Sequence, residues 1–123
     1  MLRSLVGSEM CIRDRDGNSN RVACIVFGPR NVIVIAGKNK LVKNIDEAVQ
    51  RVKTIAAPRN TQRLNCKTPC AATGACISLS GESAMICDGC KSDARICCNY
   101  VITAHERHTG RIKVILVNED LGY

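Results

Sequence analysis

The sequence predicts an α/β fold in which a layered sheet is flanked by helices. Apolar runs rich in β-branched residues lie at positions 22–27 and 32–36, and similar runs lie at positions 100–103 and 112–117. Between them, apolar residues recur with the period of an α-helix over positions 45–56. Continuous apolar runs suit strands that are covered on both faces, as they are when helices pack on a sheet. A chain of 123 residues is long enough for one domain with a real core.

The first fifteen residues do not share the pattern of the rest. Residues 1–15 show no clean period, and the composition changes at Asp16. They resemble a translated sequencing-adapter leader of the kind found in front of unrelated reading frames. We therefore expect residues 1–15 to be a non-native leader and residues 16–123 to be the domain. A flexible native arm is the alternative.

Turn-forming residues separate the first two predicted strands. Residues 16–20 are a polar loop, which we interpret as a turn. The run 22–27 is predicted to be a strand, because a Gly-Pro pair at positions 28–29 follows it directly. The second strand, at positions 32–36, is expected to end at Gly37.

A helix is predicted from residue 45 onwards. Its apolar positions fall on one face: Ile45, Ala48, Val49, Val52, Ile55 and Ala56. Asn44 is a suitable N-cap residue, and Glu47 stands where the acid of a capping box would lie. Pro58 is expected to stop this helix and to begin a short second one that reaches Leu64.

The two C-terminal strands are expected to be joined by a turn at residues 108–110. His105 and His108 flank Glu106 in this region. One interpretation is a nucleophile–base arrangement with one of the cysteines. A solvated hairpin is the simpler interpretation, and we adopt it.

Charge and hydropathy exclude several classes of protein. The net charge is +7, but the basic residues are spread along the chain and aromatic residues make up only 2%, so we expect no nucleic-acid partner. The lysines at positions 38, 40, 43 and 53 include a basic loop that could attract a carboxylate or phosphate, without the glycine spacing of a P-loop. No apolar run approaches the roughly 18–20 residues that cross a bilayer, and no secretory signal is recognisable. We expect a cytoplasmic protein in a reducing compartment, with no membrane partner.

Cysteines are concentrated in one loop-like segment, residues 66–98. Seven of the nine cysteines lie there: Cys66, Cys70, Cys76, Cys87, Cys90, Cys97 and Cys98. Close pairs of cysteines are what a tetrahedral thiolate site needs, and both zinc and iron–sulfur clusters use four thiolates. Reduced or redox-active thiols and disulfides are the alternatives. The neighbouring side chains of Cys97 and Cys98 would point in different directions in an extended chain, so only one of them is expected to face a common ion.

Local signatures recur in order from residue 16 to the end of the chain. They are Asn20-Arg21-Val22-Ala23, Phe27-Gly28-Pro29, Val32-Ile33-Val34 with Gly37-Lys38-Asn39-Lys40, Asp46-Glu47-Ala48, Ile55-Ala56-Ala57-Pro58, Lys67-Thr68-Pro69-Cys70, Thr73-Gly74-x-Cys76, Arg95-Ile96-Cys97 and Asn118-Glu119-Asp120-Leu121-Gly122-Tyr123. With them, residues 16–123 resemble the C-terminal part of a LUD-domain protein, the lactate-utilisation family. Against the family pattern, the substantial N-terminal half is replaced by the adapter-like leader, and residues 77–86 look inserted in the cysteine loop.

The resemblance implies an α/β fold similar to the NagB, ribose-phosphate isomerase and CoA-transferase superfamily, here truncated. It implies an accessory role in the oxidation of lactate to pyruvate, with the protein partners of a lactate-oxidation complex. It also implies a four-sulfur set of Cys70, Cys76, Cys90 and Cys97, with Cys87 as a substitute, for an iron–sulfur cluster or zinc. The resemblance transfers no catalytic residue.

Two further functions remain open from the sequence. One is a zinc-stabilised structural or protein-interaction module without catalytic activity. The other is an enzyme of the sugar-phosphate isomerase type, since a fold does not determine a function.

Overall fold

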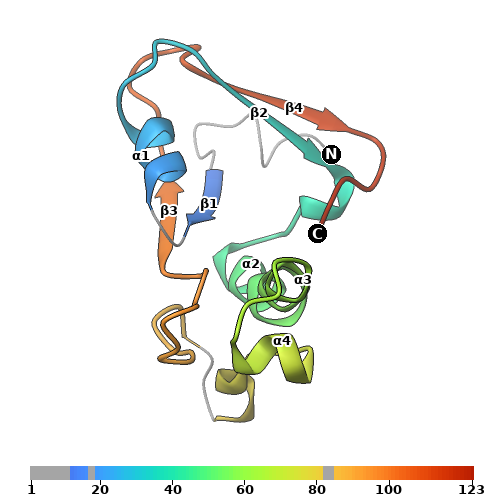
Figure 1. Ribbon diagram of the computed structural model, residues 1–123. Coiled ribbons are helices and arrows are strands. Elements are labelled where there is room, and N and C mark those ends of the chain that lie inside the picture. Colours follow the sequence, from blue (N-terminus) through green and yellow to red (C-terminus); the bar gives the residue numbers. More distant parts are fainter. Residues whose placement is uncertain (1–11, 17–18, 82–84) are drawn as a thin grey trace. The chain divides into compact units, whose positions relative to one another are not determined.

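The computed structural model describes residues 12–16, 19–81 and 85–123 (Figure 1). These residues form two compact units, which are described separately. The first unit contains the described residues up to Leu41 together with Cys97–Gly122, and the second contains Val42–Ile96 and Tyr123. Among the described residues, no helix is long and apolar enough to cross a membrane.

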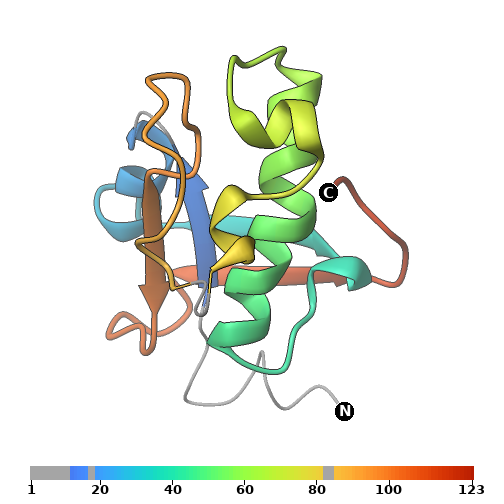
Figure 2. The same cartoon turned by 90° about the horizontal axis from the view of Figure 1, so that it is seen from below.

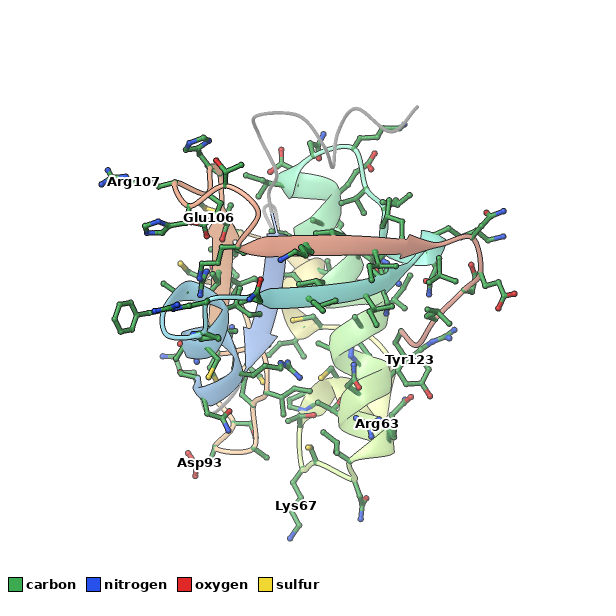
Figure 3. The ribbon with its side chains drawn as sticks, turned by 90° about the horizontal axis from the view of Figure 1, so that it is seen from above. Arg63, Lys67, Asp93, Glu106, Arg107 and Tyr123 are labelled. Atoms are coloured by element: carbon green, nitrogen blue, oxygen red, sulfur yellow. The ribbon has the colours of Figure 1, made fainter. Side chains whose placement is uncertain are left out.

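In the first unit, strands β2 (Val32–Gly37) and β4 (Ile112–Val117) form a parallel pair, seen edge to edge in Figure 3. Both strands lie where the sequence predicts them, and Val32 pairs with Ile112 at the start of the register. One face of the pair includes the buried Ile112, but on the other face Ile33 and Ile35 are 61% and 63% exposed. Among the described residues, the expected cover on both faces is therefore present on one face only.

The residues at the end of β2 contact the C-terminal residues 119–122 closely. A Cβ atom on Gly37 would lie 2.5 Å from the carbonyl oxygen of Glu119 and 2.5 Å from the amide nitrogen of Leu121. The next residues use this close approach: Lys38 donates its backbone N–H to the Glu119 carbonyl at 3.0 Å. The Asn39 side chain donates to the Gly122 carbonyl at 2.9 Å and accepts from the Leu121 N–H at 3.1 Å. Glycine is needed at position 37 because no side chain fits there.

The first unit also contains a short antiparallel pair, β1 (Ile12–Asp16) and β3 (Asn99–Thr103). The expected hairpin between β3 and β4 is wrong, because each of these strands pairs with a partner far away in sequence. Ile12 is opposite Thr103, and Asp16 is opposite Asn99. Four residues of the segment that we expect to be a leader thus take part in this pair, while residues 1–11 lie outside the described part of the chain.

Residues 22–27 do not form the strand that their apolar run predicts. They belong mostly to helix α1 (Asn20–Val26), which buries Val22 and leaves Val26 exposed, and Phe27, directly after the helix, is also exposed. A short apolar run alone cannot distinguish a strand from a helix with one buried face. The contact that favours the helix comes from the distant Arg111, described below.

In the second unit, one long helical stretch runs from α2 (Ile45–Arg51) through a π-helical turn (Val52–Ala56) into α3 (Ala57–Arg63), as Figure 2 shows. Asn44 caps the start as expected, since its side chain accepts the Glu47 N–H at 2.8 Å. Glu47 in turn accepts the N–H of Lys43 at 2.8 Å rather than that of the cap residue.

Pro58 does not stop this helical stretch. It lies in the first turn of α3, directly after the wider π-helical turn. A proline inside a regular α-helix removes a hydrogen bond and crowds the preceding turn. A π-helical turn changes the local spacing, so the chain continues to Arg63, one residue short of the predicted end.

Beyond α3, the cysteine segment has little regular structure, as expected. It contains helix α4 (Pro69–Thr73), which ends at Gly74 in the left-handed conformation (φ +80°), and a 3₁₀ turn at Ile77–Ser80. Most of its other described residues, up to Ile96, are in turns and loops.

Candidate functional site

Five thiols of the cysteine segment lie in the second unit and form no disulfide. They are Cys66, Cys70, Cys76, Cys87 and Cys90. Their exposure differs, since Cys70 is buried and Cys87 is exposed. Cys97, the remaining member of the predicted ligand set, belongs to the first unit. Each thiol is therefore considered in its own surroundings.

Cys70 points into the packing between helices. Its Sγ lies 3.4 Å from the Thr61 hydroxyl on α3 and 3.4 Å from the Thr68 hydroxyl just before α4. Thr61 is itself buried and donates to the Pro58 carbonyl at 2.8 Å. Cys70 thus acts here as a small core residue with polar partners.

Cys76 lies beside a buried lysine. Its Sγ is 3.3 Å from the hydroxyl oxygen of Ser78, and its backbone N–H donates to the Lys53 carbonyl at 3.0 Å. Lys53 is only 2% exposed, and its ammonium donates to the Ser78 hydroxyl and the Asp88 carbonyl, each at 2.8 Å, and to the Met85 carbonyl. An ammonium has three protons, so all three are used. Lys53 therefore ties the 3₁₀ turn and the Met85–Asp88 turn to the long helical stretch.

Cys87 lies in the tight turn Met85–Asp88, and Cys90 follows this turn. Asp88 closes this turn, because its N–H donates to the Met85 carbonyl at 3.1 Å and its carboxylate accepts the Met85 N–H at 3.0 Å. The guanidinium of Arg95 donates to the Cys90 carbonyl at 3.0 Å and lies where a side chain on Gly89 would be. The turn is thus held by backbone and charged groups rather than by its sulfurs.

The predicted metal centre is not formed in this arrangement. Among the described residues, no group of three or more histidine, cysteine, aspartate or glutamate side chains is placed to hold a metal ion. A four-thiolate zinc centre needs all its sulfurs within about 2.3 Å of one ion, and an iron–sulfur cluster needs them around one small cluster. As placed among the described residues, the thiols form no such group, and metal binding stays a prediction.

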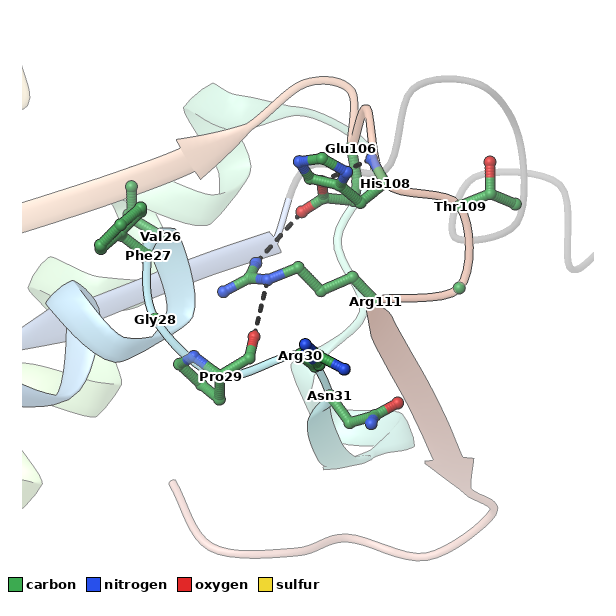
Figure 4. Close-up of a pocket in the computed structure, with 11 residues that line it drawn as sticks. Val26, Phe27, Gly28, Pro29, Arg30, Asn31, Glu106, His108, Thr109 and Arg111 are labelled. Atoms are coloured by element: carbon green, nitrogen blue, oxygen red, sulfur yellow. Dashed lines mark hydrogen bonds and ion pairs between the residues drawn. The ribbon is translucent and has the colours of Figure 1, made fainter.

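A second candidate site lies in the first unit, where two loops enclose an open cleft of about 470 Å³ (Figure 4). We call it the basic cleft. It is lined by Val26, Phe27, Gly28, Pro29, Arg30, Asn31, Glu106, His108, Thr109, Gly110 and Arg111. The loop after α1 supplies one wall and the β3–β4 connection supplies the other.

Arg111 holds the two walls of the basic cleft together. Its guanidinium donates to the carbonyls of Ile25 at 2.8 Å, Pro29 at 3.0 Å and Cys24 at 3.4 Å. It also pairs with the Glu106 carboxylate at 3.2 Å. The last carbonyls of a helix have no partner within the helix, so Arg111 satisfies the C-terminal end of α1.

Glu106 is engaged in structure rather than in chemistry with a thiol. Its carboxylate accepts the His108 N–H at 2.9 Å and the Arg111 guanidinium. The His108 N–H, together with the hydrogen bond and charge of Arg111 and the charge of His108, holds the pKa of Glu106 below its ordinary value of 4.5, while burial acts in the opposite direction.

This lowered pKa gives a pH-dependent prediction. A carboxyl group whose pKa is lower in the folded state stabilises the protein above the unfolded-state pKa, and this stabilisation is lost as the pH falls through the folded-state pKa. Glu106→Gln is therefore expected to reduce the free energy of unfolding near neutral pH and to have less effect at about pH 3. Urea unfolding at both values, with the exposed Glu119→Gln as the control, measures this. An equal loss at both values would contradict it.

Sequence reasoning missed the roles of Lys53 and Arg111. Lys53 was grouped with surface lysines, although it stands four residues after Val49 and four before Ala57, both of which are buried. That spacing places it on the apolar face and was an available signal. Arg111 carries no comparable signal, because the three carbonyls to which it donates lie 82 to 87 residues away.

Comparison with known proteins gives one match. A sequence model of the LUD domain matches residues 15–117, which include the cysteine segment and all the residues that line the basic cleft. Searches of the curated proteins and of the solved structures found no match.

Proposed function

Since the chain belongs to the LUD-domain family, which is associated with lactate utilisation, we propose that it is an accessory protein in the oxidation of lactate to pyruvate. The observation that carries this proposal is the family match over most of the chain. The same family membership supports a fold of the NagB, ribose-phosphate isomerase and CoA-transferase kind. It also supports a cytoplasmic role in which the protein acts with the partners of a lactate-oxidation complex.

The proposal is tested by growth. Deleting the gene from its host is expected to slow growth on lactate as sole carbon source and to leave growth on glucose unchanged. Expression of the full chain from a plasmid is expected to restore growth on lactate. Equal growth of the deletion strain and its parent on both carbon sources would remove the support for a role in lactate utilisation.

Metal binding by the cysteine segment is a separate proposal. It is supported by the density of thiols in a segment with little regular structure, and opposed by their placement, since Cys70 and Cys76 each have hydroxyl partners. A thiolate centre would release its ion when one ligand is lost. We expect Cys90→Ser to abolish retention of zinc or iron and Cys98→Ser to leave it unchanged.

Metal analysis of the full chain, purified without air, measures this directly. Brown protein with visible absorbance indicates an iron–sulfur cluster, and colourless protein with stoichiometric zinc indicates a zinc-stabilised module. If the parent protein contains no metal, or if both variants retain it equally, the cysteines are ordinary reduced thiols. Failure here leaves the role in lactate utilisation untouched.

A further inference from the structure

The wall of the basic cleft that follows α1 contains the only phenylalanine of the chain. Phe27 is 84% exposed, and its neighbour Val26 is 59% exposed. A large aromatic side chain usually stabilises a fold by burial, and its ring faces favour offset stacking with another planar ring. In Figure 4, Phe27 stands at the opposite end of the cleft from Thr109. The ring is thus available to a ligand rather than used by the core.

Some charged side chains of the basic cleft are paired with each other, and one is not. Arg111 and Glu106 neutralise each other, and both are occupied by the contacts described above. Arg30 also lines the cleft, and among the described residues its guanidinium has no hydrogen-bond or ion-pair partner. The remaining charge therefore favours an anion, and a guanidinium binds a carboxylate or phosphate through paired hydrogen bonds.

The rim of the basic cleft is set by two glycines. Gly28 has φ +121° and Gly110 has φ +77°, which are conformations that other residues adopt only with strain. A Cβ atom on either glycine would meet no atom within 4 Å, so glycine is used here for the path of the backbone and not for space. Both loops thus follow backbone paths that glycine adopts without strain.

From these features, we propose that the basic cleft binds a small anion that carries a planar aromatic ring, with the ring against Phe27 and the anionic group on Arg30. The volume of about 470 Å³ lies within the range of small-molecule sites, roughly 300–1,000 Å³, and suits one ligand of the size of a nucleoside monophosphate. This proposal is independent of the role in lactate oxidation.

The test uses adenosine monophosphate as the probe. Its binding to the full chain is measured by isothermal titration calorimetry. Adenosine, which lacks the charge, and inorganic phosphate, which lacks the ring, are the matched ligands. Adenosine monophosphate is expected to bind at least about tenfold more tightly than either, because only it can contact both Phe27 and Arg30. Phe27→Ala is expected to weaken adenosine monophosphate and adenosine about fivefold.

The charge is tested with a pair of arginine variants. Arg30→Gln is expected to weaken adenosine monophosphate about fivefold or more and to leave adenosine unchanged. Arg107→Gln removes the same charge from an exposed arginine that does not line the cleft and is expected to have little effect. Both residues are exposed, so neither substitution should affect folding. Equal effects of the two variants, or no saturable binding up to about 10 mM, would overturn the proposal.

Discussion

Lys53→Met is expected to lower the free energy of unfolding by about 3 kcal/mol, because it removes the only donor shared by three oxygen atoms of the cysteine segment. Methionine keeps the length and much of the volume of the side chain, so the change is mainly the loss of three hydrogen bonds. The Asp88 carbonyl would then need water in a site that is 2% exposed at Lys53. The Met85 carbonyl would keep only the Asp88 N–H, and the Ser78 hydroxyl would keep only its contact with Cys76. Urea unfolding measures the loss.

Lys43→Met is the matched control for this prediction. The Lys43 side chain is 87% exposed and lies 3.8 Å from Glu47, so its loss is expected to cost less than about 0.5 kcal/mol. Hydrogen exchange adds a local measurement, since the Leu79 and Asp88 amides bond within the two turns that Lys53 holds. Faster exchange at both is expected in Lys53→Met. A stability equal to that of Lys43→Met, with unchanged exchange, would show that Lys53 does not organise the segment.

The cysteine segment shows how far sequence reasoning reaches toward this site. Its sparse apolar pattern correctly indicates a segment that cannot order itself by burial alone, which led to the expectation of a metal ion. In the structure, the buried ammonium of Lys53 supplies the cation to which backbone oxygens of the segment turn. The contacts of Lys53 were not predicted, because they depend on which helix face the segment covers, and metal binding by the segment stays a prediction.

The elements that the sequence predicts well are those specified by local pattern. The helix beginning at Ile45 has an apolar period and an Asn44 cap, and β2 and β4 are runs of β-branched residues. Their pairing was not predictable in the same way, because a strand carries little information on which distant strand it will meet. The parallel β2–β4 pair and the β1–β3 pair both replace the hairpin expected from proximity in sequence.

Helix α1 shows a non-local contact that outweighs local preference. Val22, Ile25 and Val26 are β-branched and favour a strand, yet the segment is helical. The last carbonyls of this short helix are bonded by Arg111, whose guanidinium reaches Cys24 and Ile25 from the other end of the chain. A seven-residue helix is marginal by itself, so such a tertiary contact has a large influence.

Arg111→Met is accordingly expected to lower the free energy of unfolding by about 3 kcal/mol, because one nearly buried guanidinium serves three carbonyls and one carboxylate. Its side chain is only 10% exposed, so water replaces these bonds poorly. Arg111→Lys is expected to lose less stability than Arg111→Met, because an ammonium keeps the charge. It is still expected to be less stable than the parent, because an ammonium cannot span partners on both walls of the cleft. Urea unfolding measures both losses.

Two further variants separate the guanidinium contacts from general charge effects. Arg107→Met removes an exposed arginine of the same loop that does not line the cleft, and is expected to change the stability by less than about 0.5 kcal/mol. Adding Glu106→Gln to Arg111→Met is expected to recover part of the loss, because it removes the carboxylate left without its partner. The amide of Phe27, bonded to the Ala23 carbonyl at 2.8 Å, reports on the end of α1 and is expected to exchange faster in Arg111→Met. If its exchange and the stability both match those of Arg107→Met, Arg111 does not hold helix α1 in place.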